Sequence, residues 1–229
     1  MRDVRRPIAR TFLVLGSAAL GLGGLSLTLV GCPEETTNPP GDAGADSSSC
    51  TLEYIGDPDA AMELELTTLA PDYTAKPLAE GGDTSILIPP QGGRVIFVGL
   101  RAKNVDPCAL SLNGALRDPA TNAVSPVDGR YLNLDATEDG WGQSDATDIS
   151  TYANIAVCAN HWASTDVFDQ PFQLELSVTD RTGKKGKALL NVVPRCDETK
   201  IQDGVDLQKE CLCLCKEGYV TGEDCDAAP

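Results

Sequence analysis

The sequence predicts an all-β protein, an antiparallel β-sandwich followed by a small cysteine-rich hairpin at the C-terminus. Two observations support this fold class. Between Cys50 and Cys196, short segments alternate apolar and polar residues and are separated by turn residues, which is typical of strands with one buried face. These 147 residues show no amphipathic helical pattern, and their number suits a single domain.

The N-terminus comes before that domain and has the layout of a signal peptide. Residues 1–31 begin with four arginines against one acid, and the twenty residues from Thr11 to Val30 carry no charge. The following Leu29-Val30-Gly31-Cys32 resembles the lipobox of bacterial lipoproteins. The resemblance implies cleavage before Cys32, lipid on the Cys32 thiol and stable membrane anchoring through two or three acyl chains.

Two alternatives concern this N-terminal segment. Twenty apolar residues are long enough for an uncleaved transmembrane helix, although four glycines between Gly16 and Gly24 weaken one. Arg5-Arg6 loosely resembles a twin-arginine export signal. General secretion of the unfolded chain is favoured, because disulfides do not form in the reducing cytoplasm.

Residues 32–49 form the next segment, which is rich in Pro, Gly, Ser and acidic residues and lacks large apolar side chains. Such a segment cannot bury enough apolar surface to offset the entropy of ordering. The sequence therefore predicts a disordered acidic tether ahead of the sandwich, which spans residues 50–196.

The strands of the sandwich are predicted in order along residues 50–196. Alternation, or a short apolar run bounded by turn residues, marks each one. The predicted strands are 62–66, 85–88, 94–105, 108–116, 131–134, 153–158, 172–179 and 188–193. The run from Val95 to Asn104 resembles a central strand of an immunoglobulin-like sandwich. Cys108 follows that strand and Cys158 ends another, which makes a Cys108–Cys158 disulfide plausible.

Residues 197–229 form the cysteine-rich tail. Nine cysteines less Cys32 leave eight, an even number that predicts disulfides in an exported chain. The eight are Cys50, Cys108, Cys158, Cys196, Cys211, Cys213, Cys215 and Cys225. If 211–215 is extended, its three thiols share one face and each finds a partner elsewhere. Thiolate binding of a soft metal by Cys-x-Cys-x-Cys is the alternative.

The end of the tail, Cys213-Leu-Cys215-Lys-Glu-Gly218-Tyr219 with Cys225, is similar to the end of an EGF-like module. That resemblance implies a Cys215–Cys225 disulfide across a small hairpin. It also leaves Cys50, Cys196, Cys211 and Cys213 to pair among themselves. The upstream cysteines of a complete EGF module are missing.

Charge limits the partners of the folded part. Without residues 1–31, which hold four basic residues and one acidic residue, the chain keeps 14 Lys and Arg against 33 Asp and Glu, a net charge near −19. Such a surface repels nucleic acid and anionic lipid headgroups. A protein or a glycan is the expected partner.

Catalytic signatures are missing from the sequence. His161 is the single histidine, and no nucleophile elbow, zinc-binding helix or phosphate-binding loop accompanies it. We therefore expect no enzyme and no cofactor, and we interpret His161 as a loop residue packed beside Trp162.

The binding residues that can be named are two tryptophans and two aspartates. Trp141 and Trp162 lie in predicted loops, where they either stack on a sugar or protein partner or cap the core. Asp135 and Asp139 resemble the first half of a calcium loop, but its twelfth position is Ala146 rather than Glu. A calcium-dependent carbohydrate-binding module is therefore the alternative function.

The whole layout resembles uncharacterised lipoproteins of Gram-negative bacteria: a lipobox, an acidic tether, a cysteine-braced β domain and a Cys-x-Cys-x-Cys tail. The resemblance implies a lipid-anchored envelope protein without an assigned activity. Pro33 follows the lipidated cysteine, where aspartate would favour the inner membrane, so the outer membrane is expected.

Overall fold

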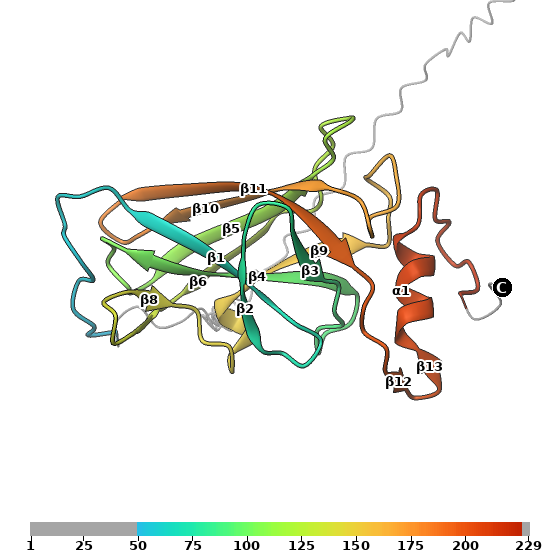
Figure 1. Cartoon of the computed structure of the whole chain (residues 1–229), viewed down its shortest axis with the longest axis horizontal. Coiled ribbons are helices and arrows are strands. Elements are labelled where there is room, and N and C mark those ends of the chain that lie inside the picture. The colour runs from blue at the N-terminus through green and yellow to red at the C-terminus, as the bar shows by residue number, and fades with distance from the viewer. Residues whose placement is uncertain (1–49, 226–229) are drawn as a thin grey trace, which may run out of the picture. The chain divides into compact units, whose positions relative to one another are not determined.

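The computed structural model describes residues 50–225, which fold as two packed antiparallel sheets with a short C-terminal tail (Figure 1). The all-β prediction is confirmed. The predicted signal peptide 1–31, the lipidation site Cys32 and the rest of the tether 32–49 lie outside the described residues. Within the described part, no helix is long and apolar enough to span a membrane.

The first sheet has six strands, and β4 (Arg94–Lys103) lies at its centre. Its order is β2-β1-β4-β8-β7, and β9 also pairs with β4. The other members are β1 (Glu63–Leu69), β2 (Ala75–Leu78), β7 (Asp135–Ala136), β8 (Gly142–Gln143) and β9 (Ala153–Cys158). The run Val95–Leu100 is entirely buried, because β4 lies between neighbours and both its faces are covered.

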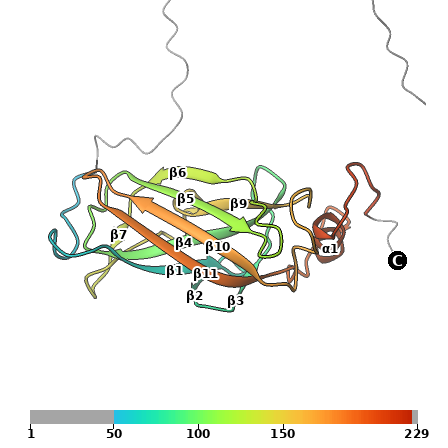
Figure 2. The same ribbon diagram turned by 90° about the horizontal axis from the view of Figure 1, so that it is seen from above.

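The second sheet has five strands in the order β3-β11-β10-β5-β6 (Figure 2). They are β3 (Gly82–Ser85), β5 (Leu110–Arg117), β6 (Asp128–Leu132), β10 (Phe172–Thr179) and β11 (Lys185–Arg195). All pairs are antiparallel except β3 with β11. In β10 the residues from Phe172 to Thr179 alternate strictly between buried and half-buried, which matches the period of two predicted for this segment.

The core lies between the two sheets. It is built from the inward residues of β5, β10, β4 and β9, all fully or almost fully buried, among them Leu110, Leu112, Leu174, Leu176, Ile96 and Ile155. Gly114 is required on β5, because a Cβ there would come within 2.9 Å of the Ile155 side chain on the facing sheet. This glycine lets the two sheets approach closely.

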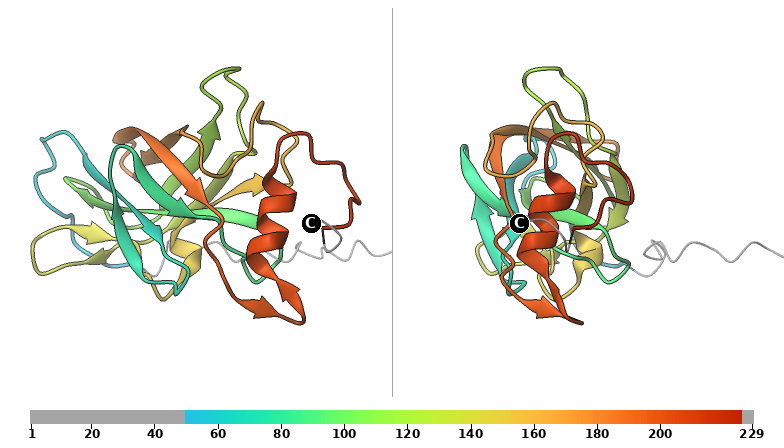
Figure 3. Two further views of the ribbon diagram at one scale, coloured as in Figure 1. Left: turned by 45° about the vertical axis from the view of Figure 1, so that its right-hand side comes forward. Right: turned by 90° about the vertical axis from the view of Figure 1, so that its right-hand side faces the viewer.

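The tail contains a β-hairpin and a helix, so residues 211–215 are helical and the extended conformation considered for them is not adopted. Strands β12 (Ile201–Gln202) and β13 (Val205–Asp206) lead into α1 (Leu207–Cys215), which lies across one end of the sandwich (Figure 3). The side chain of Asp206 caps the helix by accepting hydrogen bonds from the N–H groups of Gln208 and Lys209, both at 3.1 Å. Leu207, Cys211 and Cys215 share the buried face.

All eight cysteines predicted to form disulfides do so, and the Cys196–Cys211 bond lies within the set expected to pair among themselves, but the proposed Cys108–Cys158 and Cys215–Cys225 pairings are wrong. The bonds are Cys50–Cys108, Cys158–Cys215, Cys196–Cys211 and Cys213–Cys225. The proposed Cys108–Cys158 bridge is wrong because Cys108 bonds to Cys50, at the start of the domain, and Cys158 bonds to Cys215, on the tail helix. The proposed Cys215–Cys225 bridge fails because the helix turns Cys215 towards β9 and leaves Cys213 to meet Cys225.

Candidate functional site

Among the described residues, more than half of strand β11 lacks a partner strand on the side away from β10. Strand β3 pairs only with Val192–Arg195 of β11, and no other described strand pairs with the edge formed by residues 185–191. At Asn191 the edge is closed by the turn before β3. The N–H of Gly81 donates to the Asn191 carbonyl at 2.7 Å, and Glu80 accepts from the Asn191 N–H at 2.9 Å.

These contacts show which backbone groups face the open edge. In an antiparallel ladder, alternate residues direct both N–H and C=O to the same side of the strand. Because Asn191 points away from β10, Leu189 and Lys187 point the same way. Beyond the turn, the backbone groups of these two residues are therefore available to an additional strand.

The first sheet has a shorter open edge near this one. Strand β2 pairs with Leu66–Leu69 of β1, and no described strand covers the same edge over residues 63–65. Within residues 50–225, no backbone hydrogen bonds join the two edges, and at Gly186 side chains fill the space between them. A Cβ at Gly186 would lie 2.7 Å from the Met62 sulfur, so the absence of a side chain at Gly186 allows Met62 to fill this position.

An apolar cleft, here called the lateral cleft, lies between these edges. It has a volume of about 360 Å³, and its apolar lining residues are Leu64, Leu66, Pro77, Leu78, Ala188 and Leu190. Leu66 and Leu78 are buried, whereas Leu64, Ala188 and Leu190 are only half-buried although they belong to the inner faces of their sheets. The core of the sandwich is thus incompletely covered at this seam.

Charges of opposite sign flank the lateral cleft. On the first sheet, Glu65 lies at the rim and pairs with Arg101 at 2.7 Å. On the second sheet, the exposed side chains of Lys185 and Lys187 alternate with the inward residues of β11. The Lys187 ammonium lies 2.7 Å from Glu175, and this hydrogen bond lowers the pKa of the Glu175 carboxyl. A strand added to β11 would place its outward side chains beside these lysines.

The two tryptophans predicted as ligand contacts do not meet. Trp162 follows β9, donates its indole N–H to the Val157 carbonyl at 3.0 Å and packs on Phe172, with ring centroids 5.4 Å apart. Trp141 lies between β7 and β8 and carries the Arg101 guanidinium 5.1 Å from its ring centroid. The loop that contains Trp162 hydrogen-bonds to helix α1 through Asn160 and Val167, and α1 and strand β8 are at opposite ends of the sandwich (Figure 1). The two rings therefore cannot form one stacking platform.

Asp135 and Asp139, the predicted calcium residues, are on the β7–β8 hairpin. The Asp139 carboxylate accepts hydrogen bonds from Thr137 Oγ1 and from the Arg101 guanidinium, with which it also forms an ion pair. The Thr137 hydrogen bond is the main cause of the lowered pKa of Asp139, and Arg101 lowers it further. A cation at Asp139 would have to displace Arg101.

His161 lies at the rim of a second hollow, which also includes Trp162 and Pro126. Its Nε2 lies 3.3 Å from the Thr221 hydroxyl, and its ring is 5.7 Å from that of Tyr219. Neither contact supplies a carboxylate to orient the imidazole. The contacts around His161 are those of a loop residue that packs against the tail.

Among residues 50–225, only one group of at least three potential metal ligands has its atoms within 4.8 Å of one another, namely Cys196, Cys211 and Cys215. All three are buried, and all three are oxidised in disulfides. Four of the eight predicted disulfide residues therefore converge at the junction of the sandwich and α1, and Cys213, which the Cys-x-Cys-x-Cys alternative included, is bonded elsewhere.

The lateral cleft was not predicted from the sequence. Its residues carry no recognisable motif. The cleft is open because β2 covers only part of β1 and β3 covers only part of β11. The local signal is the run from Lys185 to Asn191, in which lysines and a half-exposed leucine occupy the outward positions of an edge strand.

Comparison with known proteins adds no relative. The chain matches no family model, no curated protein and no solved structure.

Proposed function

We propose that this chain is a lipid-anchored, non-enzymatic binding module of a bacterial outer membrane, exported as a precursor and attached through Cys32. The charge and hydropathy pattern of residues 1–31 and the lipobox-like residues before Cys32 support the anchor. The four disulfides support export, because such bonds persist in oxidising compartments.

The function of the module is to hold an extended polypeptide in the lateral cleft by strand addition. The observation that carries this proposal is the apolar cleft beside the unpaired backbone of Leu189 and Lys187. Strand addition draws affinity from backbone hydrogen bonds and specificity from alternate side chains. The cleft volume of about 360 Å³ is within the range of ligand sites.

The chemistry of the cleft defines the partner. Inward side chains of an added strand would contact Ala188 and Leu190, so they should be apolar. Outward side chains would stand beside Lys185 and Lys187, where acidic residues pair favourably across strands. The expected ligand is thus an extended segment that alternates apolar and acidic residues.

The binding test uses a fluorescent synthetic peptide of alternating Val and Glu residues. We expect it to bind the full chain and to slow hydrogen exchange at the Leu189 and Lys187 amides. A peptide with the same side chains but N-methyl groups on the backbone nitrogens that face β11 should not bind. Equal binding of the two peptides would rule out strand addition.

Two adjacent substitutions provide a matched control. Leu190→Gln places a polar amide in the lateral cleft and should abolish peptide binding, whereas Leu189→Gln changes the half-exposed outer face without adding charge and should leave binding almost unchanged. Similar affinities for both variants would place the site elsewhere. Circular dichroism of both variants checks that the fold is retained.

The anchor is tested separately by measuring the intact mass of protein extracted from its native membrane. A chain that begins at Cys32 and carries acyl mass is expected. A chain that retains residues 1–31 would contradict the lipoprotein proposal and leave the lateral cleft unaffected.

A further inference from the structure

Three buried cysteines at the junction of the sandwich and the tail, Cys196, Cys211 and Cys215, have the arrangement of a metal-ligand set. Cys211 and Cys215, one helical turn apart on α1, have their sulfur atoms 3.8 Å from each other. The Cys196 sulfur lies within 4.8 Å of both, and Cys158 is bonded to Cys215. Four thiolates on Zn²⁺, with Zn–S bonds of about 2.3 Å in a tetrahedron, are separated by about 3.8 Å.

Contacts other than disulfides hold α1 in place beside these cysteines. The backbone N–H groups of Asn160 and Val167 donate to the carbonyls of Leu214 and Cys215 at 2.9 and 2.8 Å. At the other end of α1, Gln208 Nε2 donates to the Cys196 carbonyl at 2.9 Å. Reduction of the two disulfides would therefore leave the four sulfur atoms confined to the same place.

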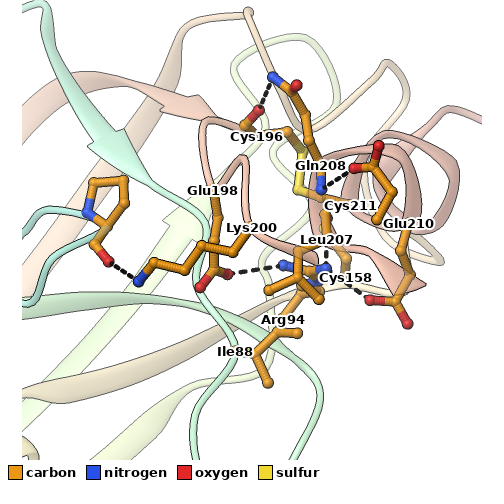
Figure 4. A network of polar contacts seen from close by, with 12 residues as sticks. Ile88, Arg94, Cys158, Cys196, Glu198, Lys200, Leu207, Gln208, Glu210 and Cys211 are labelled. Atoms are coloured by element: carbon orange, nitrogen blue, oxygen red, sulfur yellow. Dashed lines mark hydrogen bonds and ion pairs between the residues drawn. A yellow bond between two sulfur atoms is a disulfide. The ribbon is translucent and has the colours of Figure 1, made fainter. Parts of the chain in front are cut away.

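A buried cation adjoins the cluster. Arg94, 1% exposed, is the ladder partner of Cys158 on β9 and donates to the Leu207 carbonyl at 2.6 Å (Figure 4). Its Nε has no hydrogen-bond partner among the described residues. Zinc with four thiolates carries a net charge of about −2, and the Arg94 guanidinium, which also pairs with Glu198 and Glu210, offsets part of the negative charge at this junction.

We propose that Cys158, Cys196, Cys211 and Cys215 form a zinc site when their two disulfides are reduced. This inference goes beyond the proposed function and does not depend on it. A dithiol reductant supplies two electrons and two protons to each disulfide, which gives four thiols. Binding of Zn²⁺ then releases the four thiol protons and forms four Zn–S bonds, without a change in the oxidation state of the metal. The same four sulfurs thus exist either as two disulfides or as one metal centre.

The experiment reduces the full chain with a dithiol, removes the reductant and titrates with Co²⁺ as a spectroscopic probe and then with Zn²⁺. We expect one Co²⁺ per chain, with thiolate-to-metal charge transfer and the intense visible bands of tetrahedral coordination, and displacement of Co²⁺ by Zn²⁺. The double variant Cys196→Ser with Cys211→Ser should lose tetrahedral binding. It removes one whole disulfide and leaves no unpaired thiol.

Two matched double variants serve as controls, Cys50→Ser with Cys108→Ser and Cys213→Ser with Cys225→Ser. Each also removes one disulfide, so retention of the Co²⁺ spectrum in both would assign the metal to the four proposed cysteines. Equal retention in all three variants would overturn the proposal, because the metal would then bind any available thiols. Equal loss in all three would also overturn it, because binding would then depend on thiols outside the proposed four. A reduced chain that loses its β-sheet circular dichroism and shows no tetrahedral Co²⁺ spectrum would also overturn it.

Discussion

The guanidinium of Arg94 lies 2.7 Å from the carboxylate of Glu210, which joins the first residue of β4 to helix α1 (Figure 4). Arg94 also reaches Glu198 at 3.3 Å and the Leu207 carbonyl, so a single side chain contacts three points of the tail. The Arg94 and Glu198 side chains are almost completely buried. This network fixes the tail independently of the disulfides.

Replacement of Arg94 by methionine should destabilise the fold by about 3–5 kcal/mol, because it leaves the buried Glu198 carboxylate without its cation. Urea unfolding followed by circular dichroism measures the change. Arg101→Met is the matched control, since Arg101 pairs with the exposed residues Glu65 and Asp139 and its loss should cost several-fold less. Comparable losses in the two variants would contradict the role assigned to Arg94.

The loss of stability caused by removing a disulfide should depend on the length and position of the loop that the disulfide closes. Cys158–Cys215 spans 57 residues and joins β9 to α1, so its double serine variant should lose about 4 kcal/mol. Cys213–Cys225 spans 12 residues at the end of the tail, and its loss should mainly increase proteolysis after Lys216. Peptide mapping without reduction checks the pairing directly, and a Cys108–Cys158 peptide would contradict it.

Asp118 should make the fold sensitive to acid. Burial alone raises the pKa of its carboxyl, but hydrogen bonds from the Ser164 hydroxyl and N–H, both at 2.7 Å, and from Ala120 hold the pKa well below its ordinary value. Because the folded pKa is lower than the unfolded pKa of about 3.9, the stabilisation is complete above that pH and declines as the pH falls below it.

The variant Asp118→Asn tests this pH dependence. At neutral pH it should be less stable by about 2 kcal/mol, because an amide replaces one acceptor oxygen with a donor. Below about pH 4 its stability should approach that of the original protein as Asp118 takes up its proton. Parallel urea titrations at several pH values measure both curves, and a constant difference between them would contradict the assignment.

Lys184 should hold the first residues of the domain in place. Its ammonium, which has three N–H donors, lies within hydrogen-bond distance of the Tyr54 hydroxyl and of the carbonyls of Pro58, Ala60 and Asn104, at 2.6 to 3.2 Å. Lys184→Met should cost about 2 kcal/mol and leave these carbonyls without a donor. Faster hydrogen exchange confined to residues 51–61 would support the role, and Lys185→Met is the control on an exposed neighbour.

Calcium at millimolar concentration should leave the melting temperature unchanged. Asp139 already pairs with Arg101, and Asp135 is exposed at the start of the β7–β8 hairpin. A clear rise in melting temperature would instead support the calcium-dependent carbohydrate alternative. Asp139→Asn should then abolish that rise.

Strong local alternation was sufficient to predict most of the sandwich. The predicted segments 153–158 and 172–179 coincide with β9 and β10, because each has one face against the core and one outside it. Strand β2 was missed, since Ala75-Lys76-Pro77-Leu78 buries only Leu78 and contains a proline. The pairing of β3 with β11 requires contacts between segments more than one hundred residues apart, which local patterns do not encode.

The tail shows why a pattern of period two is insufficient by itself. Cys211, Cys213 and Cys215 alternate with leucines, as in a strand, but Leu207, Cys211 and Cys215 also recur every four residues after the capping residue Asp206. The helical spacing prevails because it buries one row of side chains against β9. The disulfide pairings then follow from the helix, and neither they nor the lateral cleft can be inferred without the arrangement of the strands.

The bond between Cys50 and Cys108 has a mechanical consequence when the chain is pulled from its N-terminal side. A pull on the chain ahead of Cys50 passes directly to Cys108, so residues 51–107 bear no covalent load. At the other end, Cys158–Cys215 transmits tension past residues 159–214. Between Cys50 and Cys215, only the segment from Cys108 to Cys158 can be drawn out by stretching, and the lateral cleft, whose lining residues all lie in the two shielded segments, is protected from it.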